Sequence, residues 1–385
     1  MKKTLALILA AVLACGMLTA CSGGGSGTSQ ESSAPEAASS AASESSAVSE
    51  TAGTSAESTA PEAAETILVT DAVGREVELS GLVEKAAVIN RYNLELIRGC
   101  GLIDKVVGVD SSIIENHVYW PEFSEENSFG SQNDVNYEVI AEMEPDVVIT
   151  TFYSEDLENA LKAFNIPVVA LIGYDQDINR QIDIIETMFG KTEKSSALRS
   201  FFNETYQSIS DIAAQIPEAE RKTTAWESIK DYSIANGSNA WGEMLVLAGG
   251  INMFGDASFE SSDVDAEAFI TANPDFIFKM VAASGADLSG YTPPSAEDYK
   301  AAADAYLGRA GFGEIKAVQD ENVYFVTSFS MGGLGKILGS AYIVKWLYPE
   351  AAADFDPDKV FATWLEEYQN IDYVEGQHCR LGDID

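Results

Sequence analysis

Short apolar runs alternate with amphipathic stretches along the first half of the folded chain. Four runs indicate buried strands: 85–90 (KAAVIN), 105–110 (KVVGVD), 145–150 (PDVVIT) and 166–171 (IPVVAL). Two stretches between them, 92–101 and 154–165, space their apolar residues as a helix does, and the first ends in glycine. Strand, helix and strand in series predict a parallel sheet.

A long helical stretch follows, after which the strand pattern restarts. Apolar residues recur at helical spacing over 178–216, and residues 193–216 contain neither glycine nor proline. After Pro217, apolar runs at 231–236, 274–280 and 322–327 predict further strands, with a helix at 240–250 and two closing helices. We therefore expect an α/β fold: two Rossmann-like lobes with parallel-rich sheets, joined by a single long helix, with a ligand cleft between the lobes.

These patterns predict the following boundaries along the chain: signal peptide 1–20, tether 21–65, N-terminal α/β lobe 66–191, connecting helix 192–216, C-terminal α/β lobe 217–372, and tail 373–385. About 320 residues outside the signal and tether exceed one comfortable core, which agrees with two lobes.

The N-terminus determines the compartment. Residues 1–21 (MKKTLALILAAVLACGMLTAC) carry two lysines, an apolar run and small residues before a cysteine, which is typical of a secretory signal. The ending LTAC resembles the bacterial lipobox and predicts a lipid on Cys21; a plain signal peptide is the alternative. Residues 22–65 contain no aromatic residue and predict a disordered tether. No later run is long and apolar enough to span a bilayer, so we expect a protein anchored at the extracytoplasmic face of the cell membrane.

Charge and the rare side chains exclude several classes of partner. The formal net charge of -38 repels nucleic acid. His117 and His378 are the only histidines, which argues against a zinc or manganese receptor, since such sites use several histidines. An organic chelate that already holds its metal needs no such cluster. Cys100 and Cys379 remain after Cys15 and Cys21, and the sequence leaves open whether they pair.

One pattern occurs twice. Residues 134–150 (DVNYEVIAEMEPDVVIT) and 263–279 (DVDAEAFITANPDFIFK) share identical residues at one offset, 267 − 138 = 129, including a glutamate seven residues before Pro-Asp. Asn136 and Asp265 suit helix N-caps, which places Glu138 and Glu267 in first turns. Stabilisation of the helix dipole, ~0.3–1 kcal/mol each, explains an acid there without any function. It does not explain one matched, exposed acid in each lobe.

Several segments in one order resemble class III periplasmic-type substrate-binding proteins, the receptors of ABC importers for iron-siderophore, haem and cobalamin. They include TILVTDAVGREVEL, NYEVIAEMEPDVVI, LVLAGGINMFGD and DAEAFITANPDFIF, and the resemblance covers about residues 66–370. In that family each lobe carries a glutamate that docks onto arginines of the permease dimer. The resemblance therefore assigns docking to Glu138 and Glu267, with the permease and its ATPase subunits as partners of a monomeric receptor.

The ligand is expected beyond the carboxyl ends of the strands, between the lobes. Side chains expected there are Asn90, Arg91, Tyr92, Ser111, Tyr153, Trp241, Lys279 and Phe329. Arg91 suits an anionic ligand, although pairing with a neighbouring carboxylate is the alternative. The aromatic residues suit a flat ligand, although packing is the alternative. Lys279 at a strand end is usually only solvated.

The resemblance favours an iron chelate, siderophore or haem, as the bound ligand, with no cofactor or directly bound metal; cobalamin and other metal complexes remain alternatives. An enzyme is not expected, because no G-x-S-x-G elbow is present and SMGGLGK, 330–336, lacks the P-loop spacing. That glycine-rich segment is expected to let the chain turn into the closing helices near the cleft. A tethered ligand-sensing or surface-interaction protein is the alternative of another class.

Overall fold

The structure is a computed structural model that describes residues 66–237, 239–256, 263–283 and 290–384. The expected signal peptide, the lipidated Cys21 and the tether lie outside these residues. Within the described part, no helix has both the length and the apolar character needed to cross a membrane.

Lobe one, residues 66–191, is built on a parallel four-stranded sheet of order β4-β3-β7-β8. The strand runs are apolar because helices and loops cover the sheet, as in other parallel sheets. Its strands are β1 (Ile67–Thr70), β2 (Glu76–Leu79), β3 (Ala86–Val88), β4 (Val106–Val109), β5 (Gly130–Ser131), β6 (Asp134–Val135), β7 (Val147–Thr150) and β8 (Val168–Ala170). Its helices are α1 (Arg91–Gly99), α2 (Ser111–Ile114), α3 (Tyr137–Glu142), α4 (Glu155–Lys162) and α5 (Ile178–Phe189).

Lobe two, residues 217–384, has a five-stranded sheet of order β10-β9-β11-β12-β13, parallel except for the edge strand β13. Its strands are β9 (Thr223–Glu227), β10 (Ile251–Asn252), β11 (Phe276–Met280), β12 (Val323–Val326) and β13 (His378–Arg380). Its helices are α7 (Ala240–Leu247), α8 (Ala266–Ala272), α9 (Ala296–Leu307), α10 (Lys316–Gln319), α11 (Ser328–Gly332), α12 (Ile337–Leu347) and α13 (Pro357–Thr363), which a π-helical turn extends to Tyr368.

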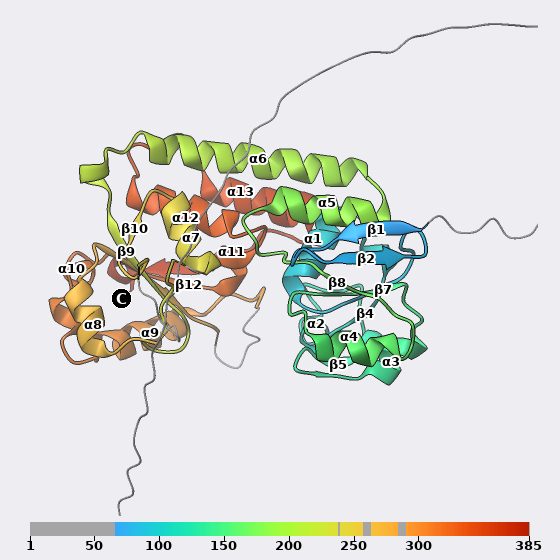
Figure 1. The fold of residues 1–385 in the computed structure, drawn as a ribbon. Helices are drawn as coiled ribbons and strands as arrows, with labels where there is room; N and C mark the ends of the chain where they lie inside the picture. Colours follow the sequence, from blue (N-terminus) through green and yellow to red (C-terminus); the bar gives the residue numbers. More distant parts are fainter. Residues whose placement is uncertain (1–65, 238, 257–262, 284–289, 385) are drawn as a thin grey trace, which may run out of the picture. The chain divides into compact units, whose positions relative to one another are not determined.

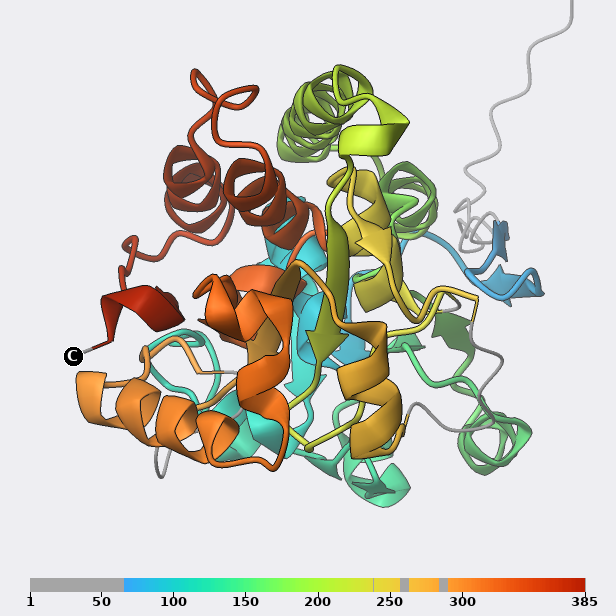
Figure 2. The ribbon, with the colours of Figure 1, turned by 90° about the vertical axis from the view of Figure 1, so that its left-hand side faces the viewer.

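One helix, α6 (Glu193–Ala214), joins the lobes and confirms the expected connecting helix at 192–216 (Figure 1). It begins at Thr192, whose hydroxyl accepts a hydrogen bond from the Ser195 N–H at 2.8 Å. It packs against α1 and α5 in lobe one and against α7 and α12 in lobe two. Figure 2 shows α6 beside the dark red closing helices. Buried Leu198 and Ile209 lie on its packed face, so both lobes share one apolar core.

Two segments differ from expectation, and a third had no prediction. Residues 231–236 form no strand: only isolated bridges occur at Ser233 and Ile234, and β9 takes the expected place in the sheet. The expected tail, 373–385, contributes β13, which pairs antiparallel with β12. Residues 67–79 form an antiparallel hairpin, β1 and β2, before the parallel sheet begins. The fold class itself, with parallel-rich sheets in two lobes, is confirmed.

The repeated pattern forms the same joint in both lobes. Asn136 and Asp265 cap α3 and α8, each accepting backbone N–H groups of the first turn. After each helix, the residue before proline has a left-handed φ: 52° at Glu144 and 43° at Asn273. The pre-proline position disfavours the right-handed helical region, so the helix ends there in both cases. The equivalence thus extends from helix start to helix end.

The aspartate of each Pro-Asp then ties its strand to the neighbouring strand. Asp146 Oδ2 accepts hydrogen bonds from the N–H groups of Glu84 and Lys85, just before β3. Asp275 Oδ2 accepts from both the N–H and the hydroxyl of Thr223, at the start of β9. Each aspartate thus holds the start of the strand that follows α3 or α8 beside the neighbouring strand.

Candidate functional site

Helices α1, α7 and α12 begin beside one another. Helix α1 starts at Arg91, α7 at Ala240, and α12 directly after Lys336. Side-chain contacts join these starts, and α1 belongs to lobe one while α7 and α12 belong to lobe two. We define the cation–aromatic cluster as Arg91, Tyr92, Tyr174, Trp241, Ser328 and Lys336.

Arg91 connects the two lobes within this cluster. Its Nη2 donates to the Tyr92 hydroxyl at 2.9 Å and to the backbone carbonyl oxygen of Ser328 at 3.0 Å. The guanidinium carbon lies 4.5 Å from the centre of the Tyr92 ring. Burial lowers the pKa of Arg91, but Tyr92 and Glu95 outweigh it, and the net pKa is raised. Arg91 is therefore a permanent cation in the cluster.

Lys336 is the most buried charge of the cluster, with 2 % of its surface exposed. Its Nζ lies 3.7 Å from the ring centre of Trp241, 4.9 Å from that of Tyr92 and 5.0 Å from that of Tyr174. The Trp241 ring stacks in turn on Trp226, with ring centres 4.5 Å apart. Among the described residues, Lys336 Nζ has neither a hydrogen-bond acceptor nor an ion-pair partner. Among these residues, the groups that contact the ammonium are the faces of aromatic rings.

The backbone that leads to Lys336 has a strained conformation. Leu334, Gly335 and Lys336 have left-handed φ values of 46°, 62° and 65° in succession, and such a conformation costs a residue other than glycine ~1–2 kcal/mol. A Cβ at Gly332 would lie 2.3 Å from the Tyr92 hydroxyl oxygen, so only glycine permits this approach. The segment thus turns the chain from α11 into α12 against lobe one, as its glycines predicted.

A buried carboxylate lies near the two cations. Glu95 is 3 % exposed, and its Oε1 accepts a hydrogen bond from the Tyr119 hydroxyl at 3.3 Å. Its Oε2 has no hydrogen-bond partner among the described residues. Burial raises the pKa of Glu95, against the opposing effect of Arg91. Burial, and then Arg91, lower the pKa of Lys336 to about 7, while Glu95 opposes them. Both groups therefore shift toward their neutral forms.

Asn90 and Ser111 lie beside the N-terminal end of α1. Asn90 caps α1, with its Oδ1 accepting from the Tyr92 N–H at 3.0 Å. It does so at a φ of 87°, a strained value for asparagine. The Asn90 N–H donates to the carboxylate of Asp110 at 2.9 Å, and Asp110 caps α2 just before the partly buried Ser111. Both predicted residues thus adjoin the start of α1.

Tyr153 and Phe329 both make contacts that packing within the fold explains. The Tyr153 hydroxyl donates to Glu158 Oε2 at 2.6 Å, and the Arg75 guanidinium carbon lies 3.5 Å from the Tyr153 ring centre, all within lobe one. Phe329 is 4 % exposed and packs edge-on against Tyr119 at 5.0 Å. These contacts agree with the alternative interpretation of both aromatic residues, which is packing rather than ligand contact.

Lys279 is buried in lobe two rather than solvated. Its Nζ donates to the carbonyl oxygens of Ser228 and Ile229 at 2.7 and 3.1 Å, and to Asp231 Oδ1 at 3.1 Å. An ammonium has three N–H donors, and these acceptors account for all of them. Lys279 and Lys336 are thus both buried lysines, but only Lys279 has oxygen acceptors among the described residues.

Glu138 and Glu267 are both exposed in the first turns of α3 and α8, as predicted. Glu267 borders a surface pocket of about 490 Å³, together with Met253 and Thr271. Met253 is 37 % exposed there.

Thiols and histidines form no metal centre in the described part of the chain, where no group of three or more His, Cys, Asp or Glu side chains could hold an ion. Cys100 is buried and Cys379 partly buried, and the two are unpaired. His117 lies exposed in a turn. His378 is in β13 against Tyr342, with ring centres 4.7 Å apart.

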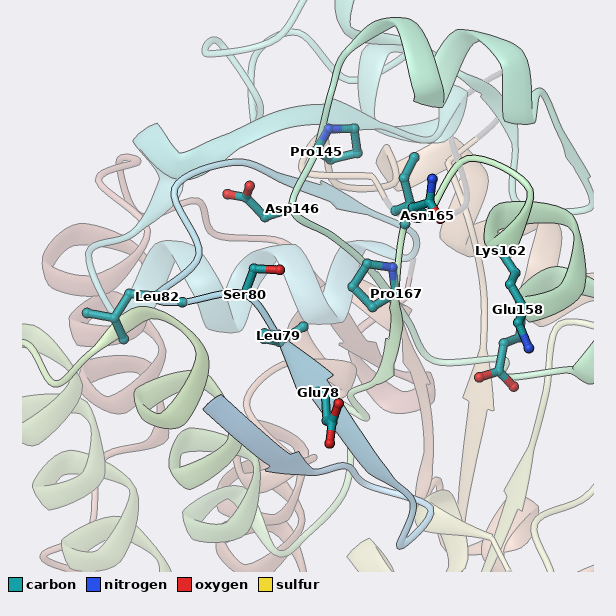
Figure 3. A pocket seen from close by; sticks show the side chains of 12 residues that line it. Glu78, Leu79, Ser80, Leu82, Pro145, Asp146, Glu158, Lys162, Asn165 and Pro167 are labelled. Atoms are coloured by element: carbon teal, nitrogen blue, oxygen red, sulfur yellow. The ribbon is translucent and has the colours of Figure 1, made fainter. Parts of the chain in front are cut away.

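Two pockets lie at opposite edges of the lobe-one sheet. A pocket of about 780 Å³ is lined by Asp146 before β7 and Pro167 before β8, so it opens at the amino ends of the strands (Figure 3). A smaller pocket of about 120 Å³ includes Ile89, Thr150 and Phe152, at the carboxyl ends. Parallel sheets bind ligands at the carboxyl edge, so the larger pocket is not at the expected place.

Residues 87–328 match the family model described as periplasmic binding protein. The chain is similar to the molybdate-binding protein MolA of Haemophilus influenzae, with 21 % identity over 81 % of this chain and 93 % of that protein. It is also similar to YvrC of Bacillus subtilis, an uncharacterised ABC transporter substrate-binding lipoprotein, with 26 % identity over 74 % of this chain and 86 % of that protein. Among solved structures, the TroA-like periplasmic binding protein FepB of Veillonella parvula matches with a TM-score of 0.67 and 20 % identity, covering 82 % of this chain and 99 % of that one.

Proposed function

The chain belongs to the periplasmic binding protein family, whose members serve ABC importers as substrate-binding proteins, and we propose that it captures an iron chelate and delivers it to an ABC permease. One observation carries the choice of ligand class. The cation–aromatic cluster presents two cations and several aromatic rings at the meeting of the lobes. A siderophore or haem offers acidic oxygens to the cations and a flat face to the rings.

The metal in such a ligand needs no side chain of the receptor. No metal-binding group of acids, cysteines and histidines exists among the described residues. A chelate enters with its coordination already complete, so the receptor has only to recognise the organic shell. This favours a chelate over a free metal ion as the cargo.

Delivery of the ligand to the permease depends on the two exposed acids, Glu138 and Glu267. Glu138 and Glu267 occupy equivalent capped first turns, one per lobe, and a carboxylate pairs directionally with arginine. We assign them to two subunits of a permease dimer. The receptor works as a monomer, tethered to the extracytoplasmic face of the membrane through a lipid on Cys21. Cys21→Ser should release the protein into the medium, and a variant that stays on the membrane with a processed N-terminus would contradict the anchor.

The ligand itself is tested by native mass spectrometry of the protein purified from its own host. We expect a co-purifying mass that contains iron and is lost on denaturation. Purification with a cobalt-containing corrinoid would support the cobalamin alternative instead. A protein that carries no complex, and that takes up no ferric chelate in a binding assay, would refute the proposal.

A second candidate is a small oxyanion. A relative is named as molybdate-binding, and a pair of cations can hold a tetrahedral anion without any aromatic contact. Competition between molybdate and a ferric chelate for the purified protein separates the two. A receptor that only senses its ligand, without transport, would bind normally yet support no uptake.

A further inference from the structure

Lys336 is a buried residue whose ammonium has no oxygen acceptor among the described residues. Only 2 % of the surface of the residue is exposed, and the described neighbours of its Nζ are the faces of Trp241, Tyr92 and Tyr174. Burial of a charged group is costly unless it is paired, and cation–π contacts offset only part of that cost. Lys279 shows how the same chain treats a buried lysine that has a purely internal role, with acceptors for every N–H.

A second cation lies beside the first. Arg91 contacts Tyr92, the ring that also contacts Lys336, and it contributes to the lowered pKa of Lys336. Like charges in one buried region repel each other. The carboxylate that opposes them is Glu95, whose Oε2 itself has no partner among the described residues. The electrostatic surroundings of Lys336 therefore favour an additional negative charge beside it.

Helix geometry favours an anion at the same place. Helices α1, α7 and α12 begin at the cluster, and each has at least eight residues. Their N-terminal ends carry partial positive charge. Tyr92, Tyr174 and Trp241 are each partly exposed, so the wall around Lys336 reaches the surface.

We propose that Lys336 and Arg91 form a two-cation anchor, one cation from each lobe, for an anionic oxygen group of the ligand, with Tyr92, Tyr174 and Trp241 as its aromatic wall. This inference rests on the proposed function as a ligand receptor and specifies the chemistry of the same site. The shared chemistry is a negatively charged oxygen donor: a carboxylate, a catecholate or a tetrahedral oxyanion.

Proton uptake follows from this arrangement. The titratable and charged groups that face Lys336 are Arg91, Tyr92 and Glu95 on α1 and Tyr174 after β8. The pKa of Lys336 is about 7 without a ligand, and a bound anion raises it. Below pH 7 the lysine is already charged and affinity is flat. Above pH 7 binding takes up a proton, and affinity falls by up to about tenfold per pH unit.

The test uses isothermal titration of the whole protein with four probes: sodium molybdate, ferric citrate, a ferric tris-catecholate and an uncharged ferric trihydroxamate. Variants are K336M, which keeps the side-chain length without charge, K336R, which keeps a permanent charge, and the control K359M on the exposed face of α13. The best-bound anionic probe should bind about tenfold or more weakly to K336M and nearly normally to K359M. At pH 8, titration in two buffers of different ionisation heat should show proton uptake by the wild type and none by K336R.

The outcomes separate this inference from the proposed function. Equal affinity of K336M for every anionic probe, or unchanged proton uptake in K336R, overturns the anchor; tight binding of the uncharged trihydroxamate would then leave the iron-chelate function standing. Binding of molybdate alone, with loss in K336M, supports the anchor and refutes the iron-chelate function. Binding of no anionic probe overturns the anchor. Should K336M fail to fold, the proton uptake of K336R still decides.

Discussion

Lys336 Nζ sits 3.7 Å from the centre of the Trp241 ring, and this contact between α7 and the start of α12 replaces the oxygen acceptor that a buried ammonium normally has. The consequence for stability has a definite sign. The pKa of Lys336 is lowered from 10.5 to about 7 in the fold, chiefly by burial. Between those pH values the unfolded chain binds a proton that the folded chain does not, so stability rises with pH.

We therefore predict a pH-dependent difference between the wild type and K336M. From pH 7 to pH 10 the free energy of unfolding of the wild type should rise relative to K336M by about 1.4 kcal/mol per pH unit. Below pH 7 the difference should be constant. Urea unfolding at a series of pH values measures it, and the subtraction removes groups that titrate in both proteins. A constant difference from pH 6 to pH 10 would show that Lys336 stays charged in the fold.

Arg91→Ala should weaken ligand binding more than it weakens the fold. The change removes charge-assisted hydrogen bonds, worth ~1.5–3 kcal/mol, from the cation–aromatic cluster. We expect ligand affinity to fall by about tenfold or more, read from the fluorescence of the Trp226–Trp241 stack. Arg199→Ala is the matched control, because Arg199 on α6 pairs with Asp183 and Glu186 on α5, outside the cation–aromatic cluster. Equal affinity losses in the two variants would make Arg91 a structural residue.

The sequence predicts a feature of this protein when the residues that specify the feature lie close together in the chain. The strand at Val147–Thr150 was predictable because three apolar residues in a row follow a Pro-Asp stop. The joint around Glu138 and Glu267 was predictable because its caps, acids and prolines lie within one short segment. Strand β9 was missed because its sequence, TTAWE, is too polar to resemble a buried strand.

Lys336 escaped the sequence analysis for a different reason. It is the last residue of a glycine-rich segment with no periodicity, and its partners Tyr92, Tyr174 and Trp241 are distant in the chain. The available signal was a lysine at the end of that segment, beyond the end of a predicted strand. Lys279 shows the converse: its position at a strand end suggested ligand contact, but tertiary structure brought the Ser228–Asp231 loop onto its ammonium.

The lobes should move little when ligand binds. Helix α6 is continuous over 22 residues and packs on helices of both lobes, and buried side chains such as Leu198 and Ile209 fix it there. A wide hinge would have to break this shared core. Small-angle scattering with and without ligand should therefore give nearly equal radii of gyration. A contraction typical of receptors with a wide hinge would contradict the role given to α6.

Glu138→Ala and Glu267→Ala should impair uptake while leaving the receptor itself intact. Each acid is exposed and lies one residue inside its helix, where it stabilises the dipole by ~0.3–1 kcal/mol. Each variant should thus lose only that stability and no ligand affinity, because neither acid belongs to the cation–aromatic cluster. Since carboxylate–arginine pairs on separate lobes share no partner, their losses should be roughly additive.

The double variant should nearly abolish uptake of labelled ligand by cells while the purified receptor still binds it normally. Glu297→Ala is the matched control, because Glu297 is also an exposed acid in the first turn of a capped helix, α9, outside the repeated joint. It should cost the same small stability and no transport. Normal uptake by the double variant would show that the two acids only stabilise the starts of their helices. Their matched positions would then reflect common ancestry of the two segments. Loss of uptake in the Glu297 variant as well would point to general surface charge, because then position within the joint would not matter.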